Sequence, residues 1–131
     1  MRFVELDELL QEADVVSLHV RLTEDSRHLI GARELELMKE EALLLNGARG
    51  EVVDLDALAA GLQAGQLGGA ALDVFPIEPF QEKHPILECE QVVFTPHAAD
   101  QTPEGIELLN EGAVDNVIAF LKGKPQHNVA V

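Results

Sequence analysis

Four short apolar runs, each bounded by polar residues, constrain the fold more than any other feature of the sequence. They cover residues 14–20, 42–46, 70–74 and 92–95. Runs of this length and composition are typical of strands that are buried on both faces of a parallel sheet. We therefore expect these segments to form the strands of one sheet.

Helical patterns separate the apolar runs. Residues 6–13 place apolar side chains at intervals of three and four behind a possible N-cap at Asp7. Residues 55–62 do the same behind Asp54, and Gly65 is placed to end that helix. An alternation of strands and helices predicts an open, doubly wound α/β sheet with right-handed crossovers.

Two further helices are expected. Residues 33–38 form a short candidate, and Thr102-Pro103 supplies an N-cap and a first-turn proline for the longest one. An apolar stripe then continues to Gly123, which predicts a long C-terminal helix. The segment 75–91 is the one long irregular connection in the sequence, and loops of that length tend to be functional.

Composition argues against several classes of protein. At 131 residues with 47% hydrophobic side chains, the chain has the length and apolar content of one domain. A formal net charge of -15 and the lack of Trp and Tyr argue against binding to nucleic acid or to an anionic membrane surface. The single cysteine, Cys89, cannot form an internal disulfide, and no segment reaches the ~20 apolar residues of a membrane span. We expect a soluble, cytoplasmic, acidic domain.

The polar residues that follow the strand candidates are the ones to weigh for function, because ligands bind beyond the carboxyl ends of the strands in open α/β sheets. Each of the four runs ends in such residues. Together they supply guanidinium, carboxylate and imidazole groups to one edge of the expected sheet: His19, Arg21, Arg49, Asp73, Glu78 and His97.

Arg49 is the most informative of these residues. No other basic residue occurs between it and Lys83, and the flanking Gly47 and Gly50 permit close approach of a backbone. One interpretation is an ion pair with one of the many acidic side chains. The other is an arginine that clamps the carboxylate of a ligand in the crevice.

His97 and Glu78 are the second group of candidates. His97 follows Thr95-Pro96, and an imidazole with an ordinary pKa near ~6.5 suits proton transfer at neutral pH. Glu78 lies between two prolines that stiffen its loop. A structural histidine and a solvated glutamate are the alternatives, and His19 is either a cofactor contact or merely a strand-end residue. No His, Cys or acidic residues have convincing metal spacing, so we expect no metal.

Separated motifs resemble, in order and spacing, the cofactor-domain signatures of the D-isomer-specific 2-hydroxyacid dehydrogenases. They are Asp14–Val20, Asn46–Gly50, Gly69–Phe75 with Glu78-Pro79, and Thr95–His97. The resemblance covers nearly the whole chain and is specific at family level, with phosphoglycerate dehydrogenases as the members expected to be most similar. It implies a Rossmann-like, NAD-binding domain.

The resemblance also implies roles. Arg49 corresponds to the arginine that holds the substrate carboxylate and carbonyl, His97 to the catalytic acid/base, and Glu78 to the acid that hydrogen-bonds that histidine. The implied reaction is hydride transfer between NAD, or NADP, and a small 2-hydroxy or 2-oxo acid, in a full-length enzyme that is a homodimer. The residues that resemble cofactor contacts are His19, Gly47, Ala48, Arg49, Asp73, His97, Ala99 and Asp100.

The sequence departs from the family pattern at several points. Arg21 stands where proline is usual, Gly47 where Thr, Ala or Ser is common, and Asp100 where a small residue is usual. No G-x-G-x-x-G occurs, although that turn binds the pyrophosphate of the cofactor. We therefore expect residues 1–131 to be a single, truncated second half of an NAD-binding domain, from which the phosphate-binding turn and the substrate domain are absent.

Two functions follow from these observations. The chain is either part of a dehydrogenase, inactive in isolation, or a non-catalytic acidic α/β module that associates through the helix beginning after Thr102. In a truncated sheet the strand at residues 14–20 has an unpaired edge and an uncovered apolar face. We therefore expect the isolated chain to be marginally stable or to self-associate.

Overall fold

The structure is a computed structural model that describes residues 2–80, 83–99 and 101–124. It divides into two compact units, Met1–His97 and Ala98–Val131. The first unit contains a parallel sheet with helices packed against it, and the second contains one long helix.

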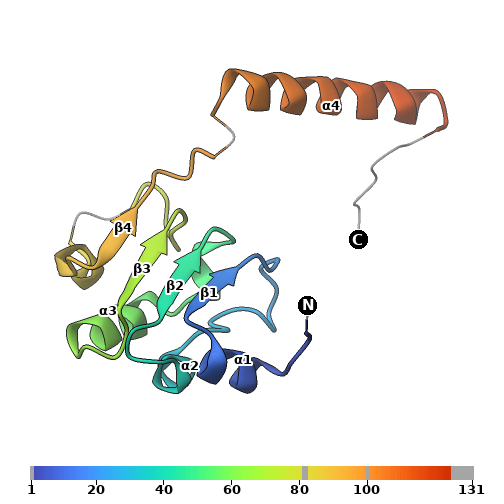
Figure 1. Cartoon of the computed structure of the whole chain (residues 1–131). Coiled ribbons are helices and arrows are strands. Elements are labelled where there is room, and N and C mark those ends of the chain that lie inside the picture. The colour runs from blue at the N-terminus through green and yellow to red at the C-terminus, as the bar shows by residue number, and fades with distance from the viewer. Residues whose placement is uncertain (1, 81–82, 100, 125–131) are drawn as a thin grey trace. The chain divides into compact units, whose positions relative to one another are not determined.

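The sheet of the first unit has four strands in the order β1-β2-β3-β4, all parallel to their neighbours (Figure 1). The strands are β1 (Val15–Leu18), β2 (Leu43–Asn46), β3 (Gly69–Leu72) and β4 (Val92–Phe94). All four predicted strands are therefore confirmed. Because consecutive strands are parallel, each chain reversal passes through a connection that returns to the same end of the sheet.

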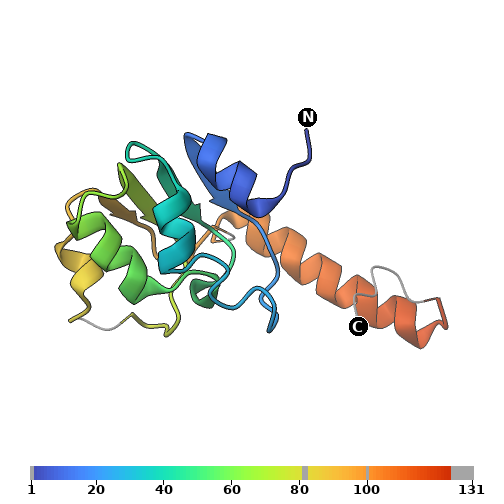
Figure 2. The same ribbon diagram turned by 90° about the horizontal axis from the view of Figure 1, so that it is seen from below.

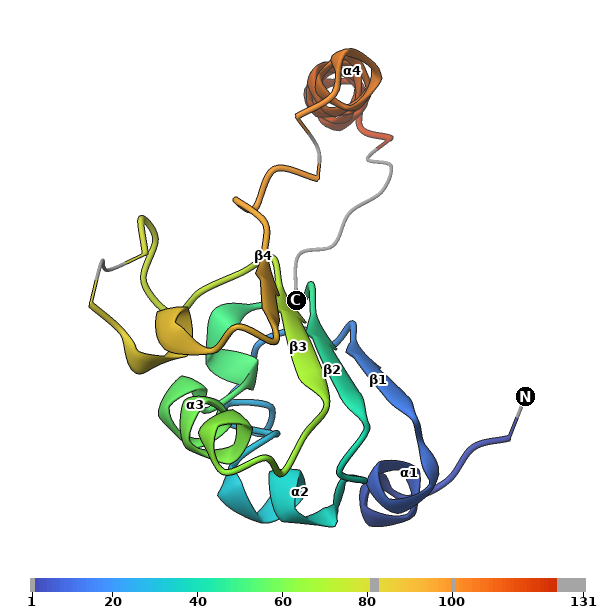
Figure 3. The same cartoon turned by 60° about the vertical axis from the view of Figure 1, so that its left-hand side comes forward.

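The helices of this unit form a row beside the sheet: α1 packs on α2, α2 on α3, and α3 on the short 3-10 helix η2 (Figure 2, Figure 3). Their bounds are α1 (Leu6–Glu12), α2 (Ala32–Leu37), α3 (Leu55–Gln63) and η2 (Pro85–Glu88). The predicted cap of α3 is confirmed, because the Asp54 carboxylate accepts a hydrogen bond from the Ala57 amide at 3.0 Å. Gly65 follows this helix with a φ of 72°, a left-handed conformation that glycine adopts without strain.

One apolar cluster fills the space between the helices and the sheet. Leu10 of α1, Leu35 of α2 and Leu58 of α3 are buried there with Leu44 of β2. Burying such a side chain stabilises the fold by about 1.5–3 kcal/mol relative to leaving it in water. Several short elements therefore share one core that none of them could build alone.

The opposite face of the sheet is exposed. Val15, Leu43 and Val93 are 53%, 42% and 63% exposed, and burial alternates along β1 and β2. The expectation that the strands are buried on both faces is wrong for β1 and β2, since no element of the first unit covers their second face. The uncovered apolar face is confirmed, and among the described residues β1 pairs only with β2.

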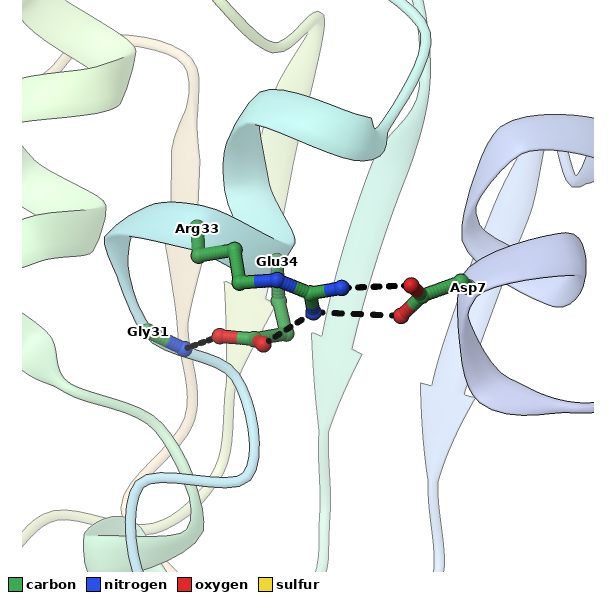
Figure 4. A network of polar contacts seen from close by, with 4 residues as sticks. All are labelled: Asp7, Gly31, Arg33 and Glu34. Carbon is green, nitrogen blue, oxygen red and sulfur yellow. Dashed lines mark hydrogen bonds and ion pairs between the residues drawn. The ribbon is translucent and has the colours of Figure 1, made fainter.

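Asp7 is not the N-cap of α1, which is a second correction. Glu5 occupies that position without a capping bond from its side chain, and Asp7 lies in the first helical turn. Its carboxylate accepts two hydrogen bonds from Arg33 of α2, one of them at 3.1 Å, and these bonds lower the pKa of Asp7 (Figure 4). Glu34 accepts from Arg33 at 2.9 Å and from the Gly31 amide at 3.1 Å. The carboxylate of Asp7 therefore joins α1 to α2 rather than capping its own helix.

The second unit contains α4 (Pro103–Leu121), the longest helix among the described residues. The hydroxyl of Thr102 accepts a hydrogen bond from the Gly105 amide at 3.0 Å, and Gly123 follows the helix with a φ of 69°. The predicted start and end of the long C-terminal helix are therefore confirmed. Across the described ranges, no helix is long and apolar enough to cross a membrane.

Candidate functional site

The carboxyl ends of the four strands bring most of the predicted site residues to one edge of the first unit. Two hollows lie there, of about 470 Å³ and about 250 Å³, and they share His19 and Gly47. The larger hollow is lined by the residues that follow β1 and β2, including Arg21, Ala48 and Arg49. The smaller lies over the exposed sheet face and reaches Asp73 and Thr95 at the ends of β3 and β4.

His97 forms a direct pair with Glu78. Nδ1 of the imidazole donates a hydrogen bond to Oε2 of the carboxylate at 2.8 Å, and both side chains are about two-fifths exposed, at 41% and 39%. The backbone of His97 has a φ of 50°, a left-handed conformation that His, Asn and Asp adopt more readily than most residues. The two residues that the sequence placed in one site are therefore in contact, 19 positions apart.

Two hydrogen-bond donors hold the Glu78 carboxylate. Besides the bond from His97, Oε1 accepts a hydrogen bond from the Phe75 amide at 3.0 Å. The pKa of Glu78 lies below its ordinary value, chiefly because of the His97 hydrogen bond, then the Phe75 amide, with smaller contributions from the charges of His97 and Arg49. Glu78 is therefore an anion at neutral pH with its two oxygens committed to partners.

Arg49 lies at the end of a tight turn that Asn46 closes. Asn46 is 2% exposed; its amide nitrogen donates to the Arg49 carbonyl at 2.9 Å and its amide oxygen accepts from the Ala48 N–H at 3.1 Å. The Arg49 guanidinium is exposed and donates to the Ala48 carbonyl at 2.7 Å. Within the described ranges Arg49 forms no ion pair with a carboxylate, so the ion-pair interpretation of this residue is not supported.

The supporting role of Asn46, which holds the turn before Arg49, was not predicted from the sequence. It occupies the buried face of β2, in register with Leu18 of β1 and Leu72 of β3. A polar side chain among apolar partners is costly unless it is hydrogen-bonded, and both of its polar atoms are. An asparagine that closes a four-residue turn directly after an apolar run is the signal that could have identified it.

Asp73 and His19 line the smaller hollow. The hydroxyl of Thr95 donates a hydrogen bond to Oδ1 of Asp73, so the ends of β3 and β4 are joined at this point. Nε2 of His19 lies 2.8 Å from the hydroxyl oxygen of Ser17 on the exposed sheet face. Both residues thus lie at the carboxyl edge of the sheet, in the hollow over its exposed face.

Two predicted cofactor contacts stay predictions, because neither belongs to the described part of the first unit. Ala99 is exposed and belongs to the second unit, and Asp100 lies outside the described residues. A metal site is likewise not formed in the described segments, where no three His, Cys, Asp or Glu side chains gather around a common point.

A match to a protein-family model identifies the fold. The model of the D-isomer specific 2-hydroxyacid dehydrogenase, NAD binding domain, matches residues 1–99. The chain belongs to this family. The Rossmann-like fold and the NAD-binding character expected from the sequence are thereby confirmed for this 2-hydroxyacid dehydrogenase domain.

Curated relatives of the domain are reductases and dehydrogenases of small acids. A glyoxylate reductase of Thermofilum pendens is 47% identical over 124 residues, which are 95% of this chain and 37% of that protein. A glycerate dehydrogenase of Methylorubrum extorquens is 41% identical over 96% of this chain and 41% of its own length. A glyoxylate/hydroxypyruvate reductase B of Escherichia coli is 43% identical over 97% and 39%. The chain thus spans about two-fifths of the length of these relatives.

Solved structures agree with this assignment. A D-lactate dehydrogenase from Aquifex aeolicus, complexed with NAD and lactic acid, superposes with a TM-score of 0.82 at 40% identity, over 92% of this chain and 41% of that one. An acyclic imino acid reductase in complex with NADPH and D-Arg gives 0.89 at 31% identity, over 98% and 40%. NAD is therefore the cofactor type of the family, and NADP is possible as well.

We predict that the pKa of Glu78 depends on the imidazole of this dehydrogenase domain. His97→Gly keeps the left-handed backbone but removes the strongest donor to the carboxylate, so the pKa of Glu78 should rise toward its ordinary value. In the unsubstituted chain, the stabilisation from the ionised carboxylate is present above the ordinary pKa and is lost as the pH falls through the lowered pKa. Carboxyl ¹³C NMR titration measures both values.

Asp7 provides the internal control for this titration, because its pKa is lowered by Arg33 and not by any group near His97. It should titrate identically in both proteins. An unchanged Glu78 titration in folded His97→Gly would contradict the 2.8 Å contact as the main cause of the lowered pKa.

Proposed function

We propose that this chain is the part of a 2-hydroxyacid dehydrogenase that holds the substrate carboxylate and transfers the proton. The observation that carries the proposal is the grouping of Arg49 with the hydrogen-bonded Glu78–His97 pair at one edge of the sheet. The substrate class is a small 2-hydroxy or 2-oxo acid. The relatives named for glyoxylate, hydroxypyruvate, glycerate and lactate support this class.

Each residue of the group has a chemical role in this proposal. The Arg49 guanidinium binds the carboxylate of the acid through two parallel hydrogen bonds and orients its carbonyl. The His97 imidazolium donates a proton to the carbonyl oxygen on reduction, and the imidazole removes it from the hydroxyl on oxidation. The Glu78 carboxylate fixes the ring through Nδ1 at 2.8 Å, which leaves Nε2 for the substrate oxygen.

The residues at this edge are suited to the nicotinamide end of NAD. The exposed, largely apolar sheet face at Leu45, Ala71 and Val93 accepts a flat ring, and the Asp73 carboxylate at its end can accept a hydrogen bond from an amide. When bound, NAD or NADP supplies or accepts the hydride. His19, Gly47 and Ala48 would line the same space, and Ala99 and Asp100 complete the proposed set of cofactor contacts.

The charge and the cysteine content of the chain support proposals about its partners and its location. A net charge of -15 makes nucleic acid and anionic membrane surfaces unsuitable partners. A single buried cysteine suits a reducing, cytoplasmic location. In its full-length form the enzyme is proposed to be a homodimer. Residues 1–131 would then be the second half of its NAD-binding domain.

The proposal is tested with a longer enzyme that carries this chain together with a phosphate-binding turn and a substrate domain. NADH oxidation, followed by absorbance, should occur with at least one of glyoxylate, hydroxypyruvate and pyruvate. Activity with none of these acids, nor with other small 2-oxo acids, would rule the proposal out.

The 131-residue chain alone should bind NAD weakly, with a dissociation constant above the micromolar range. Its sequence has no G-x-G-x-x-G turn, so the backbone amides and helix N-terminus that hold a pyrophosphate in this fold are not supplied. Isothermal titration calorimetry measures the affinity. Micromolar binding would show that the pyrophosphate site is dispensable or lies elsewhere in the chain.

A second function is favoured by one observation. In α4 the side chains of Ile106, Leu109, Val117 and Phe120 are 46–71% exposed and repeat at helical spacing along one stripe. A non-catalytic module that associates through this helix would use that stripe. It predicts a stable dimer by light scattering and no activity when a phosphate-binding turn and a substrate domain are added, which separates it from the dehydrogenase proposal.

A further inference from the structure

Gly50, the residue after Arg49, lies against the loop that carries Glu78. A Cβ atom on Gly50 would be 2.0 Å from the carbonyl carbon of Phe75 and 2.2 Å from the nitrogen of Pro76. Both are backbone atoms, so neither can rotate out of the way. The φ of Gly50 lies outside the left-handed region, so its backbone conformation is open to other residues. Glycine is required here for the contact and not for the dihedral angle.

This contact joins the two halves of the proposed site. On one side, Asn46 closes the turn that ends in Arg49, and Gly50 follows directly. On the other side, the amide of Phe75 donates to Glu78, and Glu78 accepts from His97. The backbone contact between Gly50 and Phe75 therefore joins the backbone that carries Arg49 to the loop that holds the Glu78–His97 pair.

We infer that Gly50 is a positioning residue that sets the separation between Arg49 and the Glu78–His97 pair. The inference rests on the proposed function, because it concerns the distance between a carboxylate clamp and a proton donor. Any side chain at this position must displace the Phe75–Pro76 backbone by on the order of 1 Å, since Cβ atoms essentially never approach other heavy atoms within 3.0 Å. A misplacement of about 1 Å between reacting groups costs about 10²-fold in rate.

Gly47 provides a matched comparison in the same turn. A Cβ there would meet no atom within 4 Å, so alanine fits without moving any neighbour. Gly47→Ala and Gly50→Ala add the same single methyl group three residues apart. Only the second pushes on the loop that holds Glu78.

The test measures the Glu78 carboxyl titration by ¹³C NMR in the 131-residue chain carrying Gly50→Ala, Gly47→Ala or neither. Displacement of Phe75 and separation from Arg49 should raise the pKa of Glu78 toward its ordinary value in Gly50→Ala, whereas Gly47→Ala should match the unsubstituted chain. A purely structural glycine would alter the unfolding midpoint without altering this titration. A folded Gly50→Ala chain with an unchanged Glu78 pKa would overturn the inference.

A second measurement covers the case in which Gly50→Ala does not fold. Nuclear Overhauser contacts between the Gly50 Hα protons and the Hδ protons of Pro76 are expected in the unsubstituted chain, and their absence would overturn the inference. The outcome is distinct from that of the proposed function. If only the proposed function is wrong, the longer enzyme has no 2-oxo acid reductase activity, but the Glu78 pKa still differs between Gly50→Ala and Gly47→Ala. If only the inference about Gly50 is wrong, the longer enzyme is active, but the two variants have the same Glu78 pKa.

Discussion

His97→Asn in a longer enzyme that carries this chain should lower kcat for 2-oxo acid reduction by about 10²–10⁴-fold, the usual contribution of a general acid or base, if His97 has the proposed role. Asparagine tolerates the left-handed backbone at φ 50°, so the loop after β4 keeps its conformation. Its amide cannot deliver a proton to the carbonyl oxygen. Steady-state kinetics with NADH and the best 2-oxo acid measure the loss.

His28→Asn is the matched control for this substitution. His28 is the other described residue besides glycine with a positive φ, at 51°, and its imidazole lies 4.0 Å from a different carboxylate, that of Asp54. The same chemical change there should leave kcat within a factor of about two. Full activity of His97→Asn would remove His97 from the proton-transfer role.

Arg49→Lys should lower kcat/KM by orders of magnitude as well, because lysine cannot form the two parallel bonds of a guanidinium.

Asn46→Asp should destabilise the first unit by about 3 kcal/mol at neutral pH, combining an unsatisfied buried carbonyl with a buried charge. The carboxylate keeps the shape of the amide and can still accept from the Ala48 N–H, but it cannot donate to the Arg49 carbonyl. Because the position is 2% exposed, burial favours the neutral acid. Urea unfolding followed by circular dichroism measures the change.

The pH dependence of the stability loss in Asn46→Asp checks whether the buried charge causes it. A buried acid has a folded-state pKa above the unfolded one, so the loss of stability should grow as the pH rises above the ordinary value near ~4 and be smallest below it. Asn110→Asp on the exposed surface of α4 is the control and should change the unfolding midpoint little at any pH. A neutral effect of Asn46→Asp at pH 7 would contradict the closed turn described for Asn46–Arg49.

Much of the fold could be predicted from the sequence because its signals are local. An apolar run bounded by polar residues marks each strand, and the caps at Asp54 and Thr102 act within a single turn. The grouping of Arg49, Glu78 and His97 followed from one topological rule, that parallel strands present their carboxyl ends to a common edge. The family resemblance then attached chemistry to that edge.

The features that escaped prediction depend on contacts distant in the sequence. Asp7 looked like a cap, but its position is determined by Arg33, 26 residues away. Whether a sheet face is exposed depends on which elements cover it. An apolar run such as Leu43–Asn46 has the same sequence pattern whether one face of the strand is buried or both are. The closeness of Gly50 to Phe75 is a property of two loops packed together, which no spacing in the sequence encodes.

Cys89, the only thiol of the chain, offers a way to follow local opening of the domain without an added label. It is 5% exposed at the end of η2, and its sulfur lies 3.9 Å from the Ala59 carbonyl oxygen of α3. Burial, together with the charge of Glu88, raises the pKa of the thiol, so little of the reactive thiolate exists at neutral pH. An alkylating reagent therefore reacts at a rate governed by how often η2 separates from α3. The dependence of the alkylation rate on denaturant concentration distinguishes local separation of η2 from α3 from unfolding of the whole unit.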